Sequence, residues 1–243
     1  MRRSIATSLA RRNVATPPGI LAATWLIARK DMAIEFRTRS AFFSAVVFTL
    51  LSVAIFYFTW DPTAVSSADL APGVLWVTFT FGGLLGLHRS FAVEEADRAM
   101  DALLAAPVPR EAIFGGKALA NFFFVVAVEA LSLPAVALLY NVGGSAAAWG
   151  WIALLMVLSA IGLVSVGTLF SGIVANTRLA ELLLPLLALP FFMPIVMPAA
   201  QASAQLLAGR PVGEVLAWVR VLLAFDLVFV AACMWLYPFT LED

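Results

Sequence analysis

The stretch WGWIALLMVLSAIGLVSVGTLFSGIV, at residues 149–174, contains no charged side chain. It is longer than the roughly 20 apolar residues that a helix needs to cross a bilayer. Similar apolar stretches flank it at residues 41–60, 70–87, 118–140, 182–200 and 215–239. Because these stretches lack the polar–apolar alternation of membrane β-strands, the pattern predicts an all-α membrane protein with six transmembrane helices.

The composition agrees with a membrane protein. Hydrophobic residues make up 63% of the 243 residues and charged residues only 12%, whereas about a quarter of the residues in soluble domains are charged. The longest interval between apolar stretches, residues 88–117, is too short to fold as a soluble catalytic domain. We therefore expect one transmembrane domain over residues 20–243, after a flexible cytoplasmic tail at residues 1–19.

The basic residues are distributed asymmetrically about the apolar stretches. Thirteen of the fifteen lie before the first stretch, between the second and third, or between the fourth and fifth. These intervals all fall on one side of the membrane, and basic loops are cytoplasmic by the positive-inside rule. Both termini are therefore predicted to be cytoplasmic.

An amphipathic pattern precedes the first apolar stretch. Its apolar residues recur every three or four positions and are Leu21, Trp25, Ala28, Met32 and Phe36. This spacing predicts a helix with one apolar stripe, and we interpret it as an interfacial helix on the inner leaflet. A soluble amphipathic helix that packs on a partner is the alternative, because the other faces carry acids as well as bases.

A second amphipathic pattern lies between the second and third stretches. Its apolar positions are Ala96, Ala99, Met100, Leu103 and Leu104, and the opposite side carries Glu94, Glu95, Asp97, Arg98 and Asp101. This pattern predicts a short cytoplasmic helix that ends before Pro107 and Pro109. The helix could lie on the lipid, or it could dock into a groove of another cytoplasmic protein. The acids at its start favour the protein.

Three charged residues fall inside predicted transmembrane helices: Glu129, Asp226 and Arg220. Charges are costly near the centre of the bilayer, at about 2.5–3.5 kcal/mol each, so we expect both carboxyl groups to face protein or water. Hydrogen bonding inside the bundle and contact with a partner or a transport path are both open. Arg220 and Asp226 are six residues apart, about 240° around a helix, and do not share a face.

Direct cofactor binding is not expected. The chain has one histidine, His88, and one cysteine, Cys233, so no metal-ligand cluster is available, and a lone interfacial histidine is a poor candidate for a haem ligand. A nucleotide-binding P-loop is also missing, because the residue after Gly116-Lys117 is Ala118 and the earlier glycine position is Glu111. We expect no nucleic-acid partner.

Three segments resemble the CcmB (cytochrome c maturation protein B) family of ATP-binding-cassette (ABC) permeases. They are ARKDMAIEFRTRSAFFS at residues 28–44, the segment from LAPGVLW to GGKALAN at residues 70–121, and GTLFSGIVANTRLAELLLPLLALPFFMPIVM at residues 167–197. One departure is Arg98, which follows Asp97 where the family usually has glycine.

The resemblance implies a type-2 ABC permease with an elbow helix, six membrane helices and a coupling helix that contacts the ATPase. It assigns the coupling role to Glu94, Glu95, Asp97, Arg98, Met100, Asp101, Leu103 and Leu104. It also implies a place in the bacterial inner membrane and partners CcmA, CcmC, CcmD and the haem chaperone CcmE. ATP would be bound by CcmA and haem would be carried by partner subunits.

On this basis we expect a non-catalytic permease subunit that couples ATP hydrolysis to haem handling and to release of haem-loaded CcmE in cytochrome c biogenesis. Two alternatives are an ABC exporter of another hydrophobic substrate, and a scaffold that relays ATPase motion to CcmC without moving a substrate. A homodimer is one arrangement that we consider.

Overall fold

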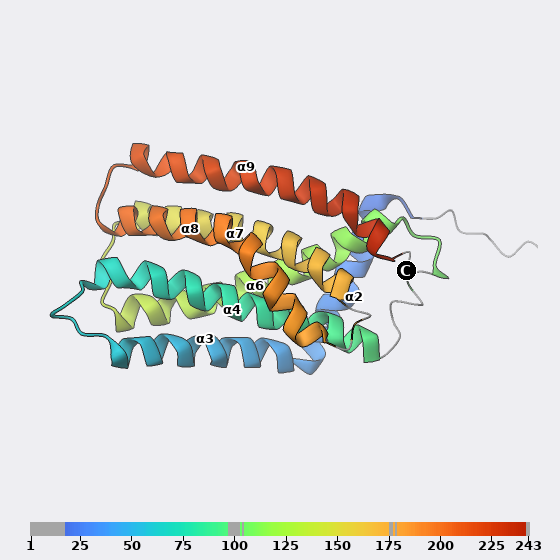
Figure 1. Cartoon of the computed structure of the whole chain (residues 1–243), viewed down its shortest axis with the longest axis horizontal. Helices are drawn as coiled ribbons and strands as arrows, with labels where there is room; N and C mark the ends of the chain where they lie inside the picture. The colour runs from blue at the N-terminus through green and yellow to red at the C-terminus, as the bar shows by residue number, and fades with distance from the viewer. Residues whose placement is uncertain (1–17, 97–102, 104, 175–176, 178, 242–243) are drawn as a thin grey trace, which may run out of the picture.

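The predicted all-α architecture is confirmed. The computed structural model describes residues 18–96, 103, 105–174, 177 and 179–241, and no strand occurs among them. The helices are α2 (Ile20–Thr38), α3 (Ser40–Thr59), α4 (Ser67–Ala96), α6 (Arg110–Leu139), α7 (Ala146–Val174), α8 (Ala180–Leu207), α9 (Val212–Leu236) and the 3-10 helix η1 (Tyr237–Leu241). The long helices run roughly along one axis, and α2 and η1 lie at the same end of the bundle (Figure 1).

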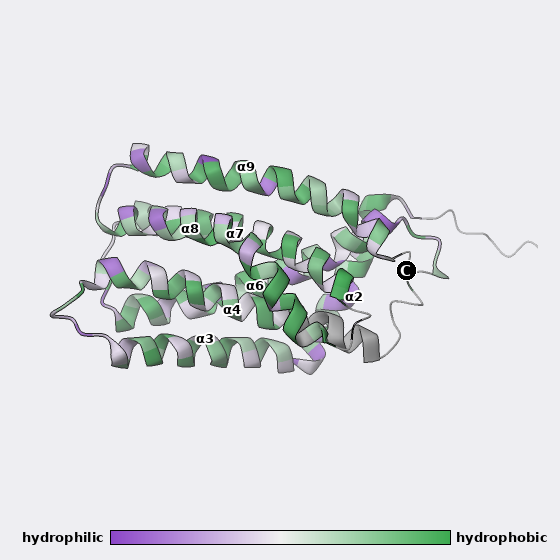
Figure 2. Ribbon diagram, in the orientation of Figure 1, coloured by the Kyte–Doolittle hydropathy of each residue, from purple (hydrophilic) through white to green (hydrophobic). Residues whose placement is uncertain are grey.

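Six helices are long and apolar enough to cross a membrane, as predicted. They are α3, α4, α6, α7, α8 and α9, and Figure 2 shows hydrophobic residues along most of their length, with hydrophilic residues toward the loops and ends. The α7 and α4 spans are 78% and 72% buried, whereas the other four are only 22–33% buried. The bundle is therefore built around α4 and α7, and the remaining spans leave most of their residues exposed on its outside.

The interfacial helix α2 is confirmed as a helix, and it is held against α6 by a face that the apolar stripe indicated only in part, at Ala28. Ala23, Ile27 and Ala28 are buried, while Leu21, Trp25 and Phe36 are exposed by 53–85%. A Cβ atom added at Gly116 of α6 would lie 2.6 Å from Ile27 Cβ. Only glycine allows this close approach, so one side of α2 is fixed to the bundle, while Leu21, Trp25 and Phe36 of the predicted stripe remain on the outside.

The second span extends further than its apolar stretch suggested. We expected a separate helix to begin near Glu94, whereas α4 is continuous through Ala96. Its 30 residues correspond to a rod about 45 Å long, against about 30 Å of hydrocarbon. The last turns of α4 therefore project beyond the hydrocarbon, and α6 starts at Arg110, directly after Pro109.

The fifth span carries four prolines. Helix α8 continues through all of them: Pro185, Pro190, Pro194 and Pro198. In Figure 1 the first turns of α8 run obliquely to the rest of the helix. Each proline removes one amide from the helical hydrogen-bond ladder, which accounts for the change of direction.

Candidate functional site

The predicted coupling segment is only partly visible. Glu94 and Glu95 belong to the last turn of α4, with side chains outside the described part of the chain. Asp97, Arg98, Met100, Asp101 and Leu104 lie outside the described residues altogether. Leu103 is half-buried and packs against the main core of the bundle. Leu103 therefore contacts this subunit itself, so it is a poor position at which to test contact with another protein.

Glu129, near the middle of α6, is almost completely buried, with 1% of its surface exposed. Neither carboxyl oxygen has a hydrogen-bond partner within the described ranges. Val125, one turn before it, packs against α7, and the adjacent Val128 packs against α3. Glu129 therefore lies inside the bundle and away from lipid, as predicted.

The buried face of α6 carries other polar residues that continue along the helix. Lys117, Asn121 and Ser132 are all at most 4% exposed. The charge of Asp31, on α2, acts on Lys117, and the Asn121 amide donates a 3.5 Å hydrogen bond to Thr168 Oγ1 of α7. With Glu129, these residues form a polar face of α6, defined here as Lys117, Asn121, Glu129 and Ser132, that extends from the α2 end of the bundle to its interior.

Asp226, on α9, is also buried, but its surroundings differ. A Cβ atom added at Gly162 of α7 would lie 2.6 Å from Asp226 Oδ1 and 2.9 Å from Ile195 Cδ1 of α8. The carboxyl group therefore occupies the space that the missing side chain of Gly162 leaves free. Like Glu129, Asp226 has no hydrogen-bond partner for either oxygen among the residues that the structure covers.

Arg220 does not join this arrangement. Arg220 is exposed whereas Asp226 is buried, which confirms that the two side chains point to different sides of α9. A surface ion pair joins Arg210 and Glu214 at the start of the same helix, with 3.4 Å between Arg210 Nη1 and Glu214 Oε2. Arg220 is therefore a surface residue and not a partner of the buried carboxyl group.

The described residues hold no group of three histidine, cysteine or acidic residues that could bind a metal ion. Cys233 is a free, buried thiol on α9. His88 lies within α4, and its side chain is outside the described part, as are those of Arg178 and Glu181. The absence of a haem ligand in this chain stays a prediction.

Sequence reasoning missed part of the polar face of α6. Lys117 was counted among the basic loop residues, yet it is buried within α6. The signal was present in the spacing, because positions 117, 121, 125 and 129 are four residues apart and three of them are polar. A stripe of this kind on a membrane helix indicates a face turned toward protein or water.

Comparison with known proteins identifies the family of this chain. The CcmB protein family matches residues 22–242. Proteins named Heme exporter protein B are similar: that of Paracoccus denitrificans is 31% identical over 180 residues, 74% of this chain and 82% of the relative. The protein of Rhodobacter capsulatus is 31% identical over 172 residues, which are 71% of this chain and 78% of the relative. The protein of Pseudomonas aeruginosa is 26% identical over 205 residues, which are 83% of this chain and 90% of the relative. Since the family match extends from the interfacial helix to the end of the last helix, this chain belongs to the CcmB protein family.

Proposed function

We propose that this chain is the membrane permease subunit of a CcmABCD-type ABC complex that handles haem during cytochrome c biogenesis. The observation that carries the proposal is the family match over residues 22–242, which includes the interfacial helix and all six spans. The similar proteins are named haem exporters. The cargo proposed for this chain is accordingly haem, with a place in the bacterial inner membrane and both termini in the cytoplasm.

The proposed division of labour follows from what the chain contains. It has six hydrophobic spans but no P-loop sequence, so hydrolysis of ATP is assigned to a CcmA-type partner. CcmC, CcmD and the haem chaperone CcmE are the other proposed partners, and they would carry the haem. In this scheme the chain is not an enzyme, and its part is to transmit the ATPase cycle to the release of haem-loaded CcmE.

The geometry of α4 supports a route for this transmission. The helix is mostly buried along its span and then projects past the hydrocarbon at the α2 end of the bundle. A partner that binds residues 94–104 would act directly on the end of one of the two central helices. A rigid helix carries displacement along its axis, so motion at this end would reach the interior beside α6 and α7.

The proposal is tested by purifying the chain in mild detergent from its own cells and identifying the proteins that accompany it. CcmA-type, CcmC-type and CcmE-type proteins are expected. An ABC ATPase with an unrelated substrate-binding partner would indicate export of another hydrophobic substrate. Recovery of CcmC together with normal CcmE release by an ATPase-inactive complex would argue against coupling.

A second experiment tests the coupling segment. Met100→Glu and Leu104→Glu place a carboxylate on its apolar side, and burial of an unpaired carboxylate against a partner is strongly unfavourable. Recovery of the ATPase should fall at least tenfold. Ala64→Glu, on the exposed loop at the opposite end of the bundle, is the matched control and should leave recovery unchanged. Undiminished ATPase recovery in both variants of the segment would remove it from the interface.

A further inference from the structure

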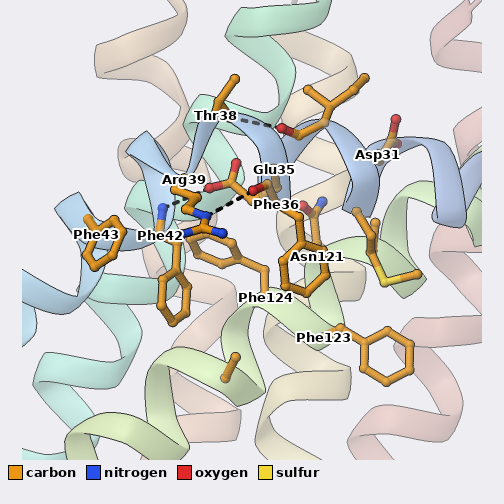
Figure 3. Close-up of a pocket in the computed structure, with 14 residues that line it drawn as sticks. Asp31, Glu35, Phe36, Thr38, Arg39, Phe42, Phe43, Asn121, Phe123 and Phe124 are labelled. Atoms are coloured by element: carbon orange, nitrogen blue, oxygen red, sulfur yellow. Dashed lines mark hydrogen bonds between the residues drawn. The ribbon is translucent and has the colours of Figure 1, made fainter.

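A pocket of about 600 Å³ lies at the corner between α2 and α3, against the side of α6. Its volume is within the range of about 300–1,000 Å³ that is typical of ligand sites. Much of its lining is aromatic, with Phe36 from α2, Phe42 and Phe43 from α3, and Phe123 and Phe124 from α6 (Figure 3). Phe36, Phe43 and Phe123 are 46–75% exposed, so the pocket opens to the outside of the bundle.

One cation lies among these aromatic rings. Arg39 forms the turn between α2 and α3 with a φ of 55°, a left-handed conformation that residues other than glycine rarely adopt. Its Nε donates a 3.1 Å hydrogen bond to the Phe36 carbonyl oxygen. The two terminal guanidinium nitrogens have no hydrogen bond or ion pair within the described residues. The turn and this hydrogen bond fix where the Arg39 side chain lies, and that side chain lines the pocket.

Each of the two acids that line the pocket has one oxygen engaged by another group, while Asp31 Oδ2 has no hydrogen-bond partner in the described chain. Asp31 Oδ1 lies 3.0 Å from Lys30 Nζ, and Glu35 Oε1 accepts a 2.9 Å hydrogen bond from the Phe42 amide. Neither carboxylate is directed at the Arg39 terminal nitrogens by a hydrogen bond or ion pair. The pocket therefore combines apolar walls and one cationic donor group with two carboxylates whose contacts are to Lys30 and to the Phe42 amide.

The pocket lies where α2 meets the start of the first span, which is where the sequence predicts the membrane surface. Helix α2 exposes Leu21, Trp25 and Phe36 and lies at the end of the bundle where the first span begins. A ligand that enters from the side would reach the aromatic walls from the hydrocarbon and Arg39 from the head-group layer. Planar guanidinium groups bind phosphate through paired, charge-assisted hydrogen bonds.

We propose that this pocket binds one phospholipid of the leaflet at the α2 end, with the phosphate on Arg39 and an acyl chain against the phenylalanine rings. The bound lipid joins the interfacial helix to the first and third spans. The site does not depend on the haem-handling role, because none of its lining residues belongs to the coupling segment.

The test uses the full-length chain, purified with its complex, and native mass spectrometry with added palmitoyl-oleoyl phosphatidylglycerol. Diacylglycerol with the same acyl chains lacks the phosphate and should bind at least tenfold more weakly. Arg39→Gln should weaken binding of phosphatidylglycerol about tenfold, as expected for loss of a charge-assisted phosphate contact. Arg37→Gln, an exposed arginine outside the pocket, should change it less than twofold.

A second pair of variants tests the apolar part. Ala127 of α6 lines the pocket and is exposed, whereas Ala130 is exposed on the same helix but does not line it. Ala127→Phe should reduce lipid binding about tenfold, and Ala130→Phe should not. Arg39→Gly relieves the left-handed backbone and provides a folded variant without the cation if Arg39→Gln is poorly produced.

Three results would overturn the proposal. Arg39→Gln and Ala127→Phe could both keep wild-type binding, or diacylglycerol could bind as well as phosphatidylglycerol. A photoreactive residue at position 127 could also capture a protein chain or haem and no lipid, which would assign the pocket to a subunit interface or to the cargo. If Arg39→Gln and Ala127→Phe lose lipid binding but handle haem normally, the lipid site is supported and the proposed function is not affected.

Discussion

Helices α6 and α9 each carry a single acidic residue deep in the bundle, and the surroundings of these two residues differ. Glu129 of α6 belongs to a face that also holds Lys117, Asn121 and Ser132. Asp226 of α9 has no such polar neighbours on its helix, and its carboxyl group packs against Gly162 of α7. The next residue, Leu227, is 76% exposed. We infer that Asp226 is a packing residue that depends on one glycine, whereas Glu129 is one member of a polar face of α6 that is buried in the bundle.

The largest effect is expected where α7 accommodates Asp226. Gly162→Leu would drive a side chain into both the Asp226 carboxyl group and Ile195, so stability should fall by about 3 kcal/mol or more. Gly150→Leu, on the same helix with open space around its Cα, is the matched control. Thermal unfolding in detergent measures both. The double variant Gly162→Ala with Asp226→Ala should recover about 1 kcal/mol relative to the sum of the single changes, and strict additivity would contradict the proposed contact.

A smaller effect of opposite direction is expected at Glu129. Glu129→Leu removes a buried polar group that has no hydrogen-bond partner in the described chain, so the isolated protein should be at least as stable as the wild type. Recovery of the complex and the yield of cytochrome c should nevertheless fall, because the polar face is interrupted. Glu129→Gln retains hydrogen-bonding capacity and should be mild in both assays. Wild-type yield from the leucine variant would mean that Glu129 serves neither an interface nor the mechanism.

The polar face of α6 also makes a weak contact with α7. The 3.5 Å hydrogen bond between Asn121 and Thr168 is long, and interhelical hydrogen bonds in membranes average about 0.6 kcal/mol. A double-mutant cycle with Asn121→Leu and Thr168→Val should therefore give a coupling of about 0.5 kcal/mol. A coupling above about 2 kcal/mol would show that this pair holds α6 in place, and the polar face would then be structural like Asp226.

The smallest effect concerns an acid outside the membrane that does have partners. The side-chain hydroxyl and the backbone amide of Thr63 donate hydrogen bonds to Asp61 and lower its pKa below the usual 3.8. A lowered pKa stabilises the loop at neutral pH, and this contribution is lost as the pH falls through the pKa of the folded state. Thr63→Val should raise the pKa of Asp61, measured by the pH titration of its carboxyl carbon signal in NMR. An unchanged titration would remove Thr63 as the cause.

Much of the fold was predictable because membrane helices must be long, apolar and internally hydrogen-bonded. The six spans follow from this alone, and the interfacial helix follows from its amphipathic pattern. Helix ends were harder: α4 continues to Ala96 even though the residues after Leu87 become charged. The stripe predicted for the interfacial helix includes the buried Ala28, but Ala23 and Ile27, which are also buried, lie outside it, so the pattern identified the packed face only in part.

The candidate site was less accessible to sequence reasoning. Glu129 and Asp226 were predicted to be buried because charge in hydrocarbon is costly, and both are. Their difference depends on which residue lies opposite, and the pairing of Asp226 with Gly162 joins positions 64 residues apart in the chain. The pocket at Arg39 depends on a backbone conformation with positive φ, for which the residue type provides no signal.

The most direct test of the account is the content of covalently bound haem in cytochrome c when every copy of this chain is deleted from its own cells. We predict that c-type cytochromes are lost from the deletion strain, return with the wild-type chain, and do not return with Met100→Glu, although that variant is inserted in the membrane. Normal amounts of haem-bearing cytochrome c in the deletion strain would contradict the proposed role in haem handling.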